Sequence, residues 1–250
     1  ENLMQRSYGG LVAIASFGLA ISSQIGCSGN KGVHHNERHL SFEEKDWKPI
    51  KQIEENWAPF RHMHLYLCAF HIAKEDPKFQ VIAHHYCAAQ GKDVHQCVIY
   101  DSKGPDPKLL GVEYIINDGV YRTLPDEEKK FWHPHAYEIL SGQLVAPDLK
   151  DNGDALFPTL ITTWGKTWHT WRDPLSDLPL GEPLLMWSAN GDGQIDEKLI
   201  EKRDSELGID TDKIRKKRKS YGFDVPNIPT PKSLEELGRQ WNESGLNTPY

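Results

Sequence analysis

The sequence predicts a single α+β domain, in which two amino-terminal helices pack on an antiparallel or mixed sheet and an extended helical tail follows. The length of 250 residues suits one domain of moderate size with tails. Apolar residues three and four apart over 56–73 indicate an amphipathic helix. Two short apolar runs, at 96–101 and 109–117, indicate a pair of strands.

Two helices are expected before the sheet. The first covers 56–73 and the second covers 79–90, after an acidic break that contains a proline. His71 lies on the apolar side of the first helix. His84 and His85 are adjacent in the second helix, so they would point about 100° apart and would not serve one small site equally.

The two expected strands form a hairpin, because the residues between them are rich in glycine and proline. Glu113 lies in the middle of the second strand, in a mostly apolar run. A carboxylate that is buried there needs a partner. Glu113 is therefore a metal ligand, a base, or a residue on the solvent-facing side of the sheet, and the sequence leaves these alternatives open.

A short helix over 125–132 is predicted next, because it has proline at its first position and acidic residues in its first turn. His133 and His135 follow it. In an extended segment they point the same way, and two imidazoles on one face can chelate a metal. A strand over 137–146 is expected after them, and His169 is expected to line the same interior.

The carboxyl-terminal part is predicted to be an extension of the domain. We place the domain at 56–207 and a charged, proline-containing extension at 208–250. Residues 211–220 should form a charged helix. Its basic run, 213–219, is interpreted as a solvated helix face, or as a contact with anionic lipid or another acidic surface.

The amino-terminal part resembles an export signal. The apolar run at 11–22 is too short to span a bilayer comfortably, but it has the length of a secretory signal core. Ile25-Gly26-Cys27-Ser28 resembles the end of a bacterial lipoprotein signal. We predict a lipoprotein segment at 1–27 and a flexible tether at 28–55, so that a lipidated Cys27 would anchor the protein at a membrane outside the cytoplasm. Another targeting peptide or a buried amino-terminal helix is the alternative, with a lipid-droplet or cytoplasmic location.

Composition restricts the classes of partner. The net charge of -7 and the pI near 5.9 argue against a nucleic-acid partner, which requires a basic face. The sequence has no CxxC pair, which argues against a zinc ribbon. Cys87 and Cys97 could form a disulfide in an oxidising compartment, or they could be buried free thiols.

Histidine is the most informative residue type, because eight of the twelve histidines lie between His62 and His135. Imidazole is costly to bury without a partner and is the commonest metal ligand. We expect the following side chains to converge, with a transition-metal ion as the candidate cofactor: His71, His84, His85, Glu113, His133, His135 and His169. At a metal site, Glu113 or Glu138 would orient the ligands or act as a base. The function that we expect first is that of a non-enzymatic, lipid-associated or structural protein with a histidine-rich core network. The alternatives are a transition-metal-binding protein or metal-dependent enzyme that uses this cluster, and a protein that binds haem or an apolar ligand.

Several phrases of the sequence resemble the oil body-associated protein family. They are Cys68-Ala69-Phe70-His71, Ala83-His84-His85-Tyr86-Cys87, Tyr137-Glu138, and the segments 96–102, 110–115, 124–133, 165–171 and 178–181. The resemblance covers roughly 57–200 and implies a homologous fold without an established reaction. Plant members of that family are associated with seed lipid droplets, and it has bacterial and fungal members. The lipoprotein-like segment, the proline-containing tail and Pro134 depart from its pattern.

Overall fold

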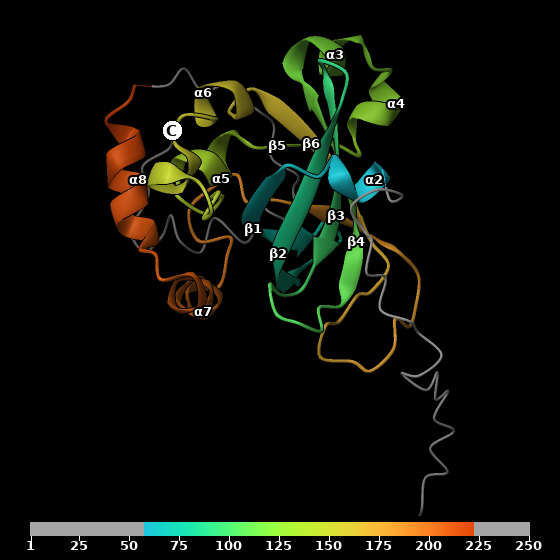
Figure 1. The fold of residues 1–250 in the computed structure, drawn as a ribbon. Coiled ribbons are helices and arrows are strands. Elements are labelled where there is room, and N and C mark those ends of the chain that lie inside the picture. The colour runs from blue at the N-terminus through green and yellow to red at the C-terminus, as the bar shows by residue number, and fades with distance from the viewer. Residues whose placement is uncertain (1–57, 223–250) are drawn as a thin grey trace, which may run out of the picture. The chain divides into compact units, whose positions relative to one another are not determined.

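The computed structural model describes residues 58–222, and its centre is a closed antiparallel barrel of six strands (Figure 1). The barrel strands are β1 (Leu65–Ala73), β2 (Asp76–Gln90), β3 (Val94–Tyr100), β4 (Leu109–Asn117), β6 (Thr163–His169) and β7 (Leu184–Trp187). They pair in the order β1-β2-β3-β4-β6-β7, and β7 pairs with β1 to close the barrel. The short strand β5 (His133–Pro134) pairs with β6 beside them.

The predicted amino-terminal helices are wrong, because residues 65–73 of the first segment and all of the second form strands. β1 and β2 form an antiparallel hairpin in which Leu67 lies opposite His85 and Phe70 lies opposite Ile82. Both faces of these strands are buried, one inside the barrel and the other under helices. A strand that is buried on both faces has a continuous apolar run instead of an alternating one, so its spacings imitate those of a helix.

The hairpin predicted from the two apolar runs is confirmed, since β3 and β4 are neighbouring antiparallel strands. Cys87 and Cys97 lie opposite each other in β2 and β3 and form a disulfide, the first of the two alternatives. Cys68 is a free, buried thiol on the outer side of the barrel wall. The strand expected over 137–146 is wrong, because that segment begins with a helix.

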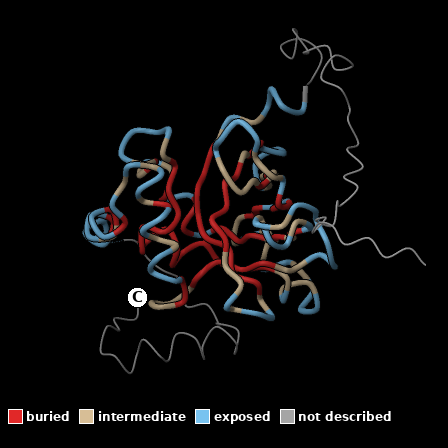
Figure 2. The backbone as a smooth tube through the Cα atoms, turned by 90° about the horizontal axis from the view of Figure 1, so that it is seen from below, coloured by how far each residue is buried: buried red, intermediate tan, exposed pale blue. Residues whose placement is uncertain are grey.

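Four helices lie together on one side of the barrel (Figure 1): α5 (Ala136–Leu140), α6 (Phe157–Leu160), α7 (Glu197–Leu207) and α8 (Thr211–Lys219). Phe157 of α6 and Ile139 of α5 pack with the interior-facing Leu67. α7, α8 and one residue of α5 cover the outer side of β1 and β2. Phe70 and Ile82 of the barrel wall pack there with Tyr137 and Ile214. The smaller helices are α2 (Ala58–Arg61), α3 (Asp118–Thr123), α4 (Asp126–Lys129) and the 3-10 turn η2 (Lys150–Gly153). Figure 2 shows the buried stretches in the middle of the described part of the chain, with exposed turns around them.

The predicted extended helical tail is also wrong, because α8 packs on the domain through Ile214 and Arg218. Arg218 and Arg203 are fully buried. Arg218 donates hydrogen bonds to the carbonyls of Ile139 and Leu144 and pairs with Asp154 at 3.0 Å. Arg203 donates to the two carbonyls between them, 142 and 143. The two arginines therefore fix the segment that follows α5.

The predicted lipoprotein segment with Cys27, the tether at 28–55 and the chain beyond residue 222 lie outside the described residues. Within residues 58–222, none of the helices has both the length and the apolar character that crossing a bilayer requires.

Candidate metal centre

The barrel interior consists of two apolar layers with a polar belt between them. Inward-facing positions alternate along each strand, so β1 contributes Leu67, Ala69, His71 and Ala73 in that order. One apolar layer contains Leu67, Ala69 and Ile115, and the other contains Ala73, Val81, Ala83, Ile99, Leu110 and Met186. The belt between them contains His71, His85, Glu113, Thr167 and His169, all of them buried.

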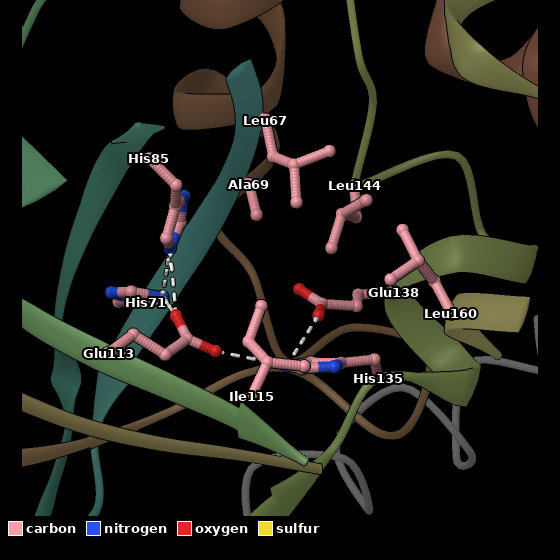
Figure 3. Close-up of a pocket in the computed structure, with 10 residues that line it drawn as sticks. All are labelled: Leu67, Ala69, His71, His85, Glu113, Ile115, His135, Glu138, Leu144 and Leu160. Atoms are coloured by element: carbon pink, nitrogen blue, oxygen red, sulfur yellow. Dashed lines mark hydrogen bonds and ion pairs between the residues drawn. The ribbon is translucent and has the colours of Figure 1, made fainter. Parts of the chain in front are cut away.

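The first half of the site is a triad of His71, His85 and Glu113. The Nε2 atoms of the two histidines are 3.0 Å apart. The Oε2 atom of Glu113 lies 3.0 Å from Nε2 of His85 and 3.5 Å from Nε2 of His71 (Figure 3). His71 also shares a hydrogen bond of 2.9 Å with His169, from Nδ1 to Nε2. The donor atoms of the triad come from three strands of the wall, the neighbouring β1 and β2 and the strand β4 beyond β3.

The second half is a triad of His133, His135 and the same Glu113. The other carboxylate oxygen, Oε1, lies 3.0 Å from Nε2 of His135 and 3.8 Å from Nε2 of His133. Strand β5 positions His133, and His135 begins α5, so Pro134 between them turns the chain from strand to helix. Glu138, one helical turn further on, has its Oε1 3.8 Å from Nε2 of His135.

The absence of a side chain at Gly165 leaves room for the three donor atoms of the second triad. A Cβ atom at this position would lie 2.2 Å from Oε1 of Glu113 and 2.7 Å from the Nε2 atoms of both His133 and His135. Any residue larger than glycine would therefore push these donors apart. Gly165 pairs with His133 in β5 and with Ile115 in β4, which places it beneath the cluster.

The hydrogen bonds of the site place a lone pair of His135 opposite the carboxylate of Glu113. The hydroxyl of Thr163 donates to the carbonyl of Leu160, so it accepts from Nδ1–H of His135 at 2.8 Å. A neutral His135 then directs the lone pair of Nε2 at the carboxylate of Glu113, and only a proton or a cation between them makes that contact favourable. Among the described residues, neither ring nitrogen of His133 has a hydrogen-bond partner. A buried imidazole without partners is costly.

Burial controls the charge of the cluster. It lowers the pKa of His71 to about 4 and lowers the pKa of His133 and His169 well below the usual range. Burial alone would raise the pKa of Glu113, but the contacts of its carboxylate with the imidazoles of His135, His71 and His85 bring the pKa well below its ordinary value. Burial and the charge of Glu113 raise the pKa of Glu138. At neutral pH these shifts keep His71, His133 and His169 neutral and Glu113 ionised, the forms that bind metals.

The donor set fits a transition-metal ion. Donor atoms that bind one ion at about 2.0–2.1 Å lie roughly 3.0–3.4 Å from each other. The measured separations in the first triad are 3.0–3.5 Å, and two separations in the second are 3.0 and 3.8 Å. Imidazole nitrogen favours zinc, iron, copper or nickel over magnesium or calcium.

A small cavity adjoins the donors. Figure 3 shows Glu113 and His135 on one side of it, Glu138 beyond them, and Leu67, Leu144 and other apolar side chains around the rest. Its volume of about 10 Å³ is room for roughly one water molecule. That volume is too small for haem or a lipid chain.

The structure brings together six of the seven residues that the sequence nominated. His84 is the exception, because adjacent strand residues face opposite sides. It lies on the outer side of the barrel wall, where its Nδ1 shares a hydrogen bond of 2.8 Å with the hydroxyl of Tyr66. Gly165 and Thr163 could not be identified as site residues from the sequence, because their roles depend on strand pairing. Glu138 was expected, like Glu113, to orient the ligands or act as a base, and it lies beside His135.

The fold and the site define a class: a small closed antiparallel barrel with a buried histidine and glutamate cluster in its interior. The chain belongs to the family described as Protein of unknown function (DUF1264), whose model matches residues 57–222. It is similar to Oil body-associated protein 1B of Arabidopsis thaliana, with 35% identity over 66% of this chain and 69% of the relative. It is also similar to Oil body-associated protein 1A of Zea mays (38%, over 66% and 70%) and to Oil body-associated protein 2C of Arabidopsis thaliana (33%, over 77% and 80%). No solved structure matches this chain.

Acid is expected to destabilise the metal-free protein between about pH 6.5 and pH 4. The pKa values of His71 and His84 are about 4 in the folded protein because both are buried, whereas an unfolded histidine has a pKa of about 6.5. The unfolded state therefore binds more protons in this window, and the free energy of unfolding falls as the pH is lowered. Urea denaturation with chelator at pH 7.5, 6, 5 and 4.5 measures the effect. A constant midpoint across this series would contradict it, and a constant m-value shows that the same surface unfolds at each pH.

Proposed function

We propose that this protein binds a divalent transition-metal ion inside the barrel. The observation that supports the proposal is the direction of four imidazole Nε2 atoms toward the two oxygens of Glu113, a carboxylate that is 2 % exposed. His71, His85, His133 and His135 are the histidine donors. A bound cation would relieve the facing lone pairs at His135 and give His133 a partner.

Residues that contact the other ring nitrogen of the donor histidines support the same proposal. A metal-ligating histidine usually donates its other ring N–H to a fixed acceptor, which sets the tautomer. Thr163 accepts in this way from Nδ1 of His135, and His169 is within hydrogen-bond distance of Nδ1 of His71. The ion would act as a Lewis acid or activate a bound water, and the cavity beside Glu113 has room for one such molecule.

Metal content tests the proposal. We expect untagged wild-type protein to retain a transition metal when elemental mass spectrometry follows removal of loosely bound ions. The double variant His133→Ala, His135→Ala should lose much of that metal, because it keeps only part of the donor set. His84→Gln serves as the control, since His84 is a buried histidine outside the cluster. Wild-type protein that holds no metal, even after incubation with zinc, iron or manganese, would contradict the proposal.

A second candidate function is association with a lipid surface. The relatives are named oil body-associated proteins, and the segment 170–183 between β6 and β7 exposes three leucines. Leu175, Leu178 and Leu180 are 90%, 61% and 69% exposed. Lys108 donates to the carbonyls of Pro174 and Ser176, so the segment is held by the body of the protein. Exposed apolar groups gathered in this way are typical of interaction sites.

Replacing all three leucines by serine should weaken binding to phospholipid-coated triolein droplets by at least about tenfold, because each leucine that enters lipid contributes roughly 1.5–3 kcal/mol. Flotation of the full chain measures the bound fraction. Every sample should carry Cys27→Ser, which removes the predicted lipid anchor and isolates the contribution of the barrel domain. Leu149→Ser is the matched control, since Leu149 is an exposed leucine outside this segment. Equal flotation of the triple variant and the control would exclude the leucine segment as the lipid contact.

A further inference from the structure

We infer that the barrel interior holds two metal ions, with the carboxylate of Glu113 as the bridge between them. This inference rests on the proposed metal-binding function and adds the number and arrangement of the ions. The candidate donors form two groups: His71 and His85 with Glu113, and His133 and His135 with Glu113. Glu113 is the one residue that the groups share.

The two oxygens of Glu113 face different histidine pairs. Oε2 lies within 3.5 Å of the Nε2 atoms of His71 and His85, and Oε1 lies within 3.8 Å of those of His133 and His135. A carboxylate that served a single ion would not need a histidine pair at each oxygen. In sites with two metals the ions are about 3.5–4 Å apart, a separation that one carboxylate can bridge.

Distances among the donors also favour two ions. All donor atoms of one group lie within 4.8 Å of one another, and this holds for each group separately. The ring centroids of His71 and His85 are 4.8 Å apart, and those of His133 and His135 are 5.2 Å apart. The centroids of His71 and His133, which belong to different groups, are 6.3 Å apart. Each ion would have three protein donors, and open coordination positions are typical of reactive rather than structural metals.

The cavity and Glu138 complete the arrangement. Glu138 lies on the far side of the cavity from Glu113, with Oε1 3.8 Å from Nε2 of His135 (Figure 3). Divalent ions would offset the negative charge of Glu113, which is buried without a lysine or arginine among the residues that line the cavity. The remaining space, enough for about one water, is suited to a solvent molecule on an open coordination position.

Gly165 gives a selective test of the second ion. The atoms nearest to a Cβ at this position are the three donors of the second triad: Glu113 Oε1, His133 Nε2 and His135 Nε2. Gly165→Ala should therefore block the second ion and leave His71, His85 and Oε2 of Glu113 for the first. His133→Ala removes one donor of the same triad without adding bulk, so it tests the same point if the methyl group prevents folding.

Stoichiometry is measured on the metal-free full chain by titration with Mn²⁺, with electron paramagnetic resonance at each step. We expect two equivalents and an exchange-coupled spectrum in the wild type, and one equivalent with an uncoupled spectrum in Gly165→Ala or His133→Ala. One equivalent in the wild type would overturn the bridge but leave metal binding in place. Two equivalents without coupling would also overturn the bridge. No binding of Mn²⁺, Zn²⁺ or Co²⁺ in the wild type would overturn both this inference and the proposed function.

Discussion

Glu113→Gln is expected to abolish the stabilisation that a transition metal gives to this protein. An ion that binds only the folded state at a thousand times its Kd contributes about 4 kcal/mol. For a domain of this size, each kcal/mol raises the Tm by roughly 2–4 °C, so the wild type should melt about 8–16 °C higher with metal than with chelator. Glu113 supplies an oxygen to both triads, so its amide replacement should reduce this difference to nearly zero.

For each variant, the Tm with metal minus the Tm with chelator reports metal binding separately from the stability of the metal-free fold. Glu113→Gln also alters the contacts with His135 and His85, so it changes the stability of the metal-free protein as well. The comparison therefore uses only the rise in Tm on adding metal. His84→Gln is the matched control. It removes a buried histidine on the outer side of the wall and should keep the full rise on adding metal. If Glu113→Gln shows the same rise as the wild type, the metal binds elsewhere and the interior cluster is only a hydrogen-bonded network.

Arg218→Met is expected to lower the free energy of unfolding by about 3–5 kcal/mol, the usual cost of breaking a buried ion pair from one side. The change leaves Asp154 without its buried partner and removes the side-chain donor to the carbonyls of Ile139 and Leu144, of which Ile139 keeps a bond from the backbone N–H of Gly142. It also removes the contact of the guanidinium with the ring of Phe157. Methionine is about as helix-favouring as arginine, so helix propensity does not explain the loss.

Urea denaturation measures this change, and Lys216→Met on the same helix is the control. Lys216 is exposed, so its substitution should change stability by less than about 0.5 kcal/mol. If Arg218→Met lowers the free energy of unfolding as little as Lys216→Met does, the buried ion pair contributes nothing to the stability of the fold. The segment held by Arg218 follows His135 and Glu138 directly, so metal affinity should fall in the same variant.

Part of the fold could be predicted from the sequence. The hairpin of β3 and β4 was evident because glycine and proline separate its apolar runs, and Glu113 was conspicuous inside the second run. β1 and β2 were taken for helices, because burial on both faces removed the alternation by which a strand is recognised. The buried role of Arg218 could not be seen in a run of lysines and arginines, since only tertiary packing distinguishes it from its exposed neighbours.

The candidate site was predicted in composition but not in geometry. His71, His85, Glu113, His133 and His135 were nominated as residue types that bind metals, and their convergence depends on strand pairing across the barrel. The choice between His84 and His85 required the knowledge that the segment is a strand. Nothing in the sequence indicated that Gly165 belongs to the site. Its importance is that it has no Cβ atom next to donor side chains that are distant in the sequence.

The position of the polar belt between two apolar layers has a consequence for how fast an ion could enter or leave. The histidine donors and Glu113 are at most 3% exposed, and leucine, isoleucine, valine and methionine side chains close the barrel above and below them. An ion held there would have no open route to solvent, so exchange would wait for strands to separate or for α5 to move. Local opening of such a core is rare and slow compared with side-chain motion. Uptake of a metal by the folded protein and its removal by a chelator would then proceed at the rate of this opening, so each titration or chelation step should be followed until the metal content no longer changes.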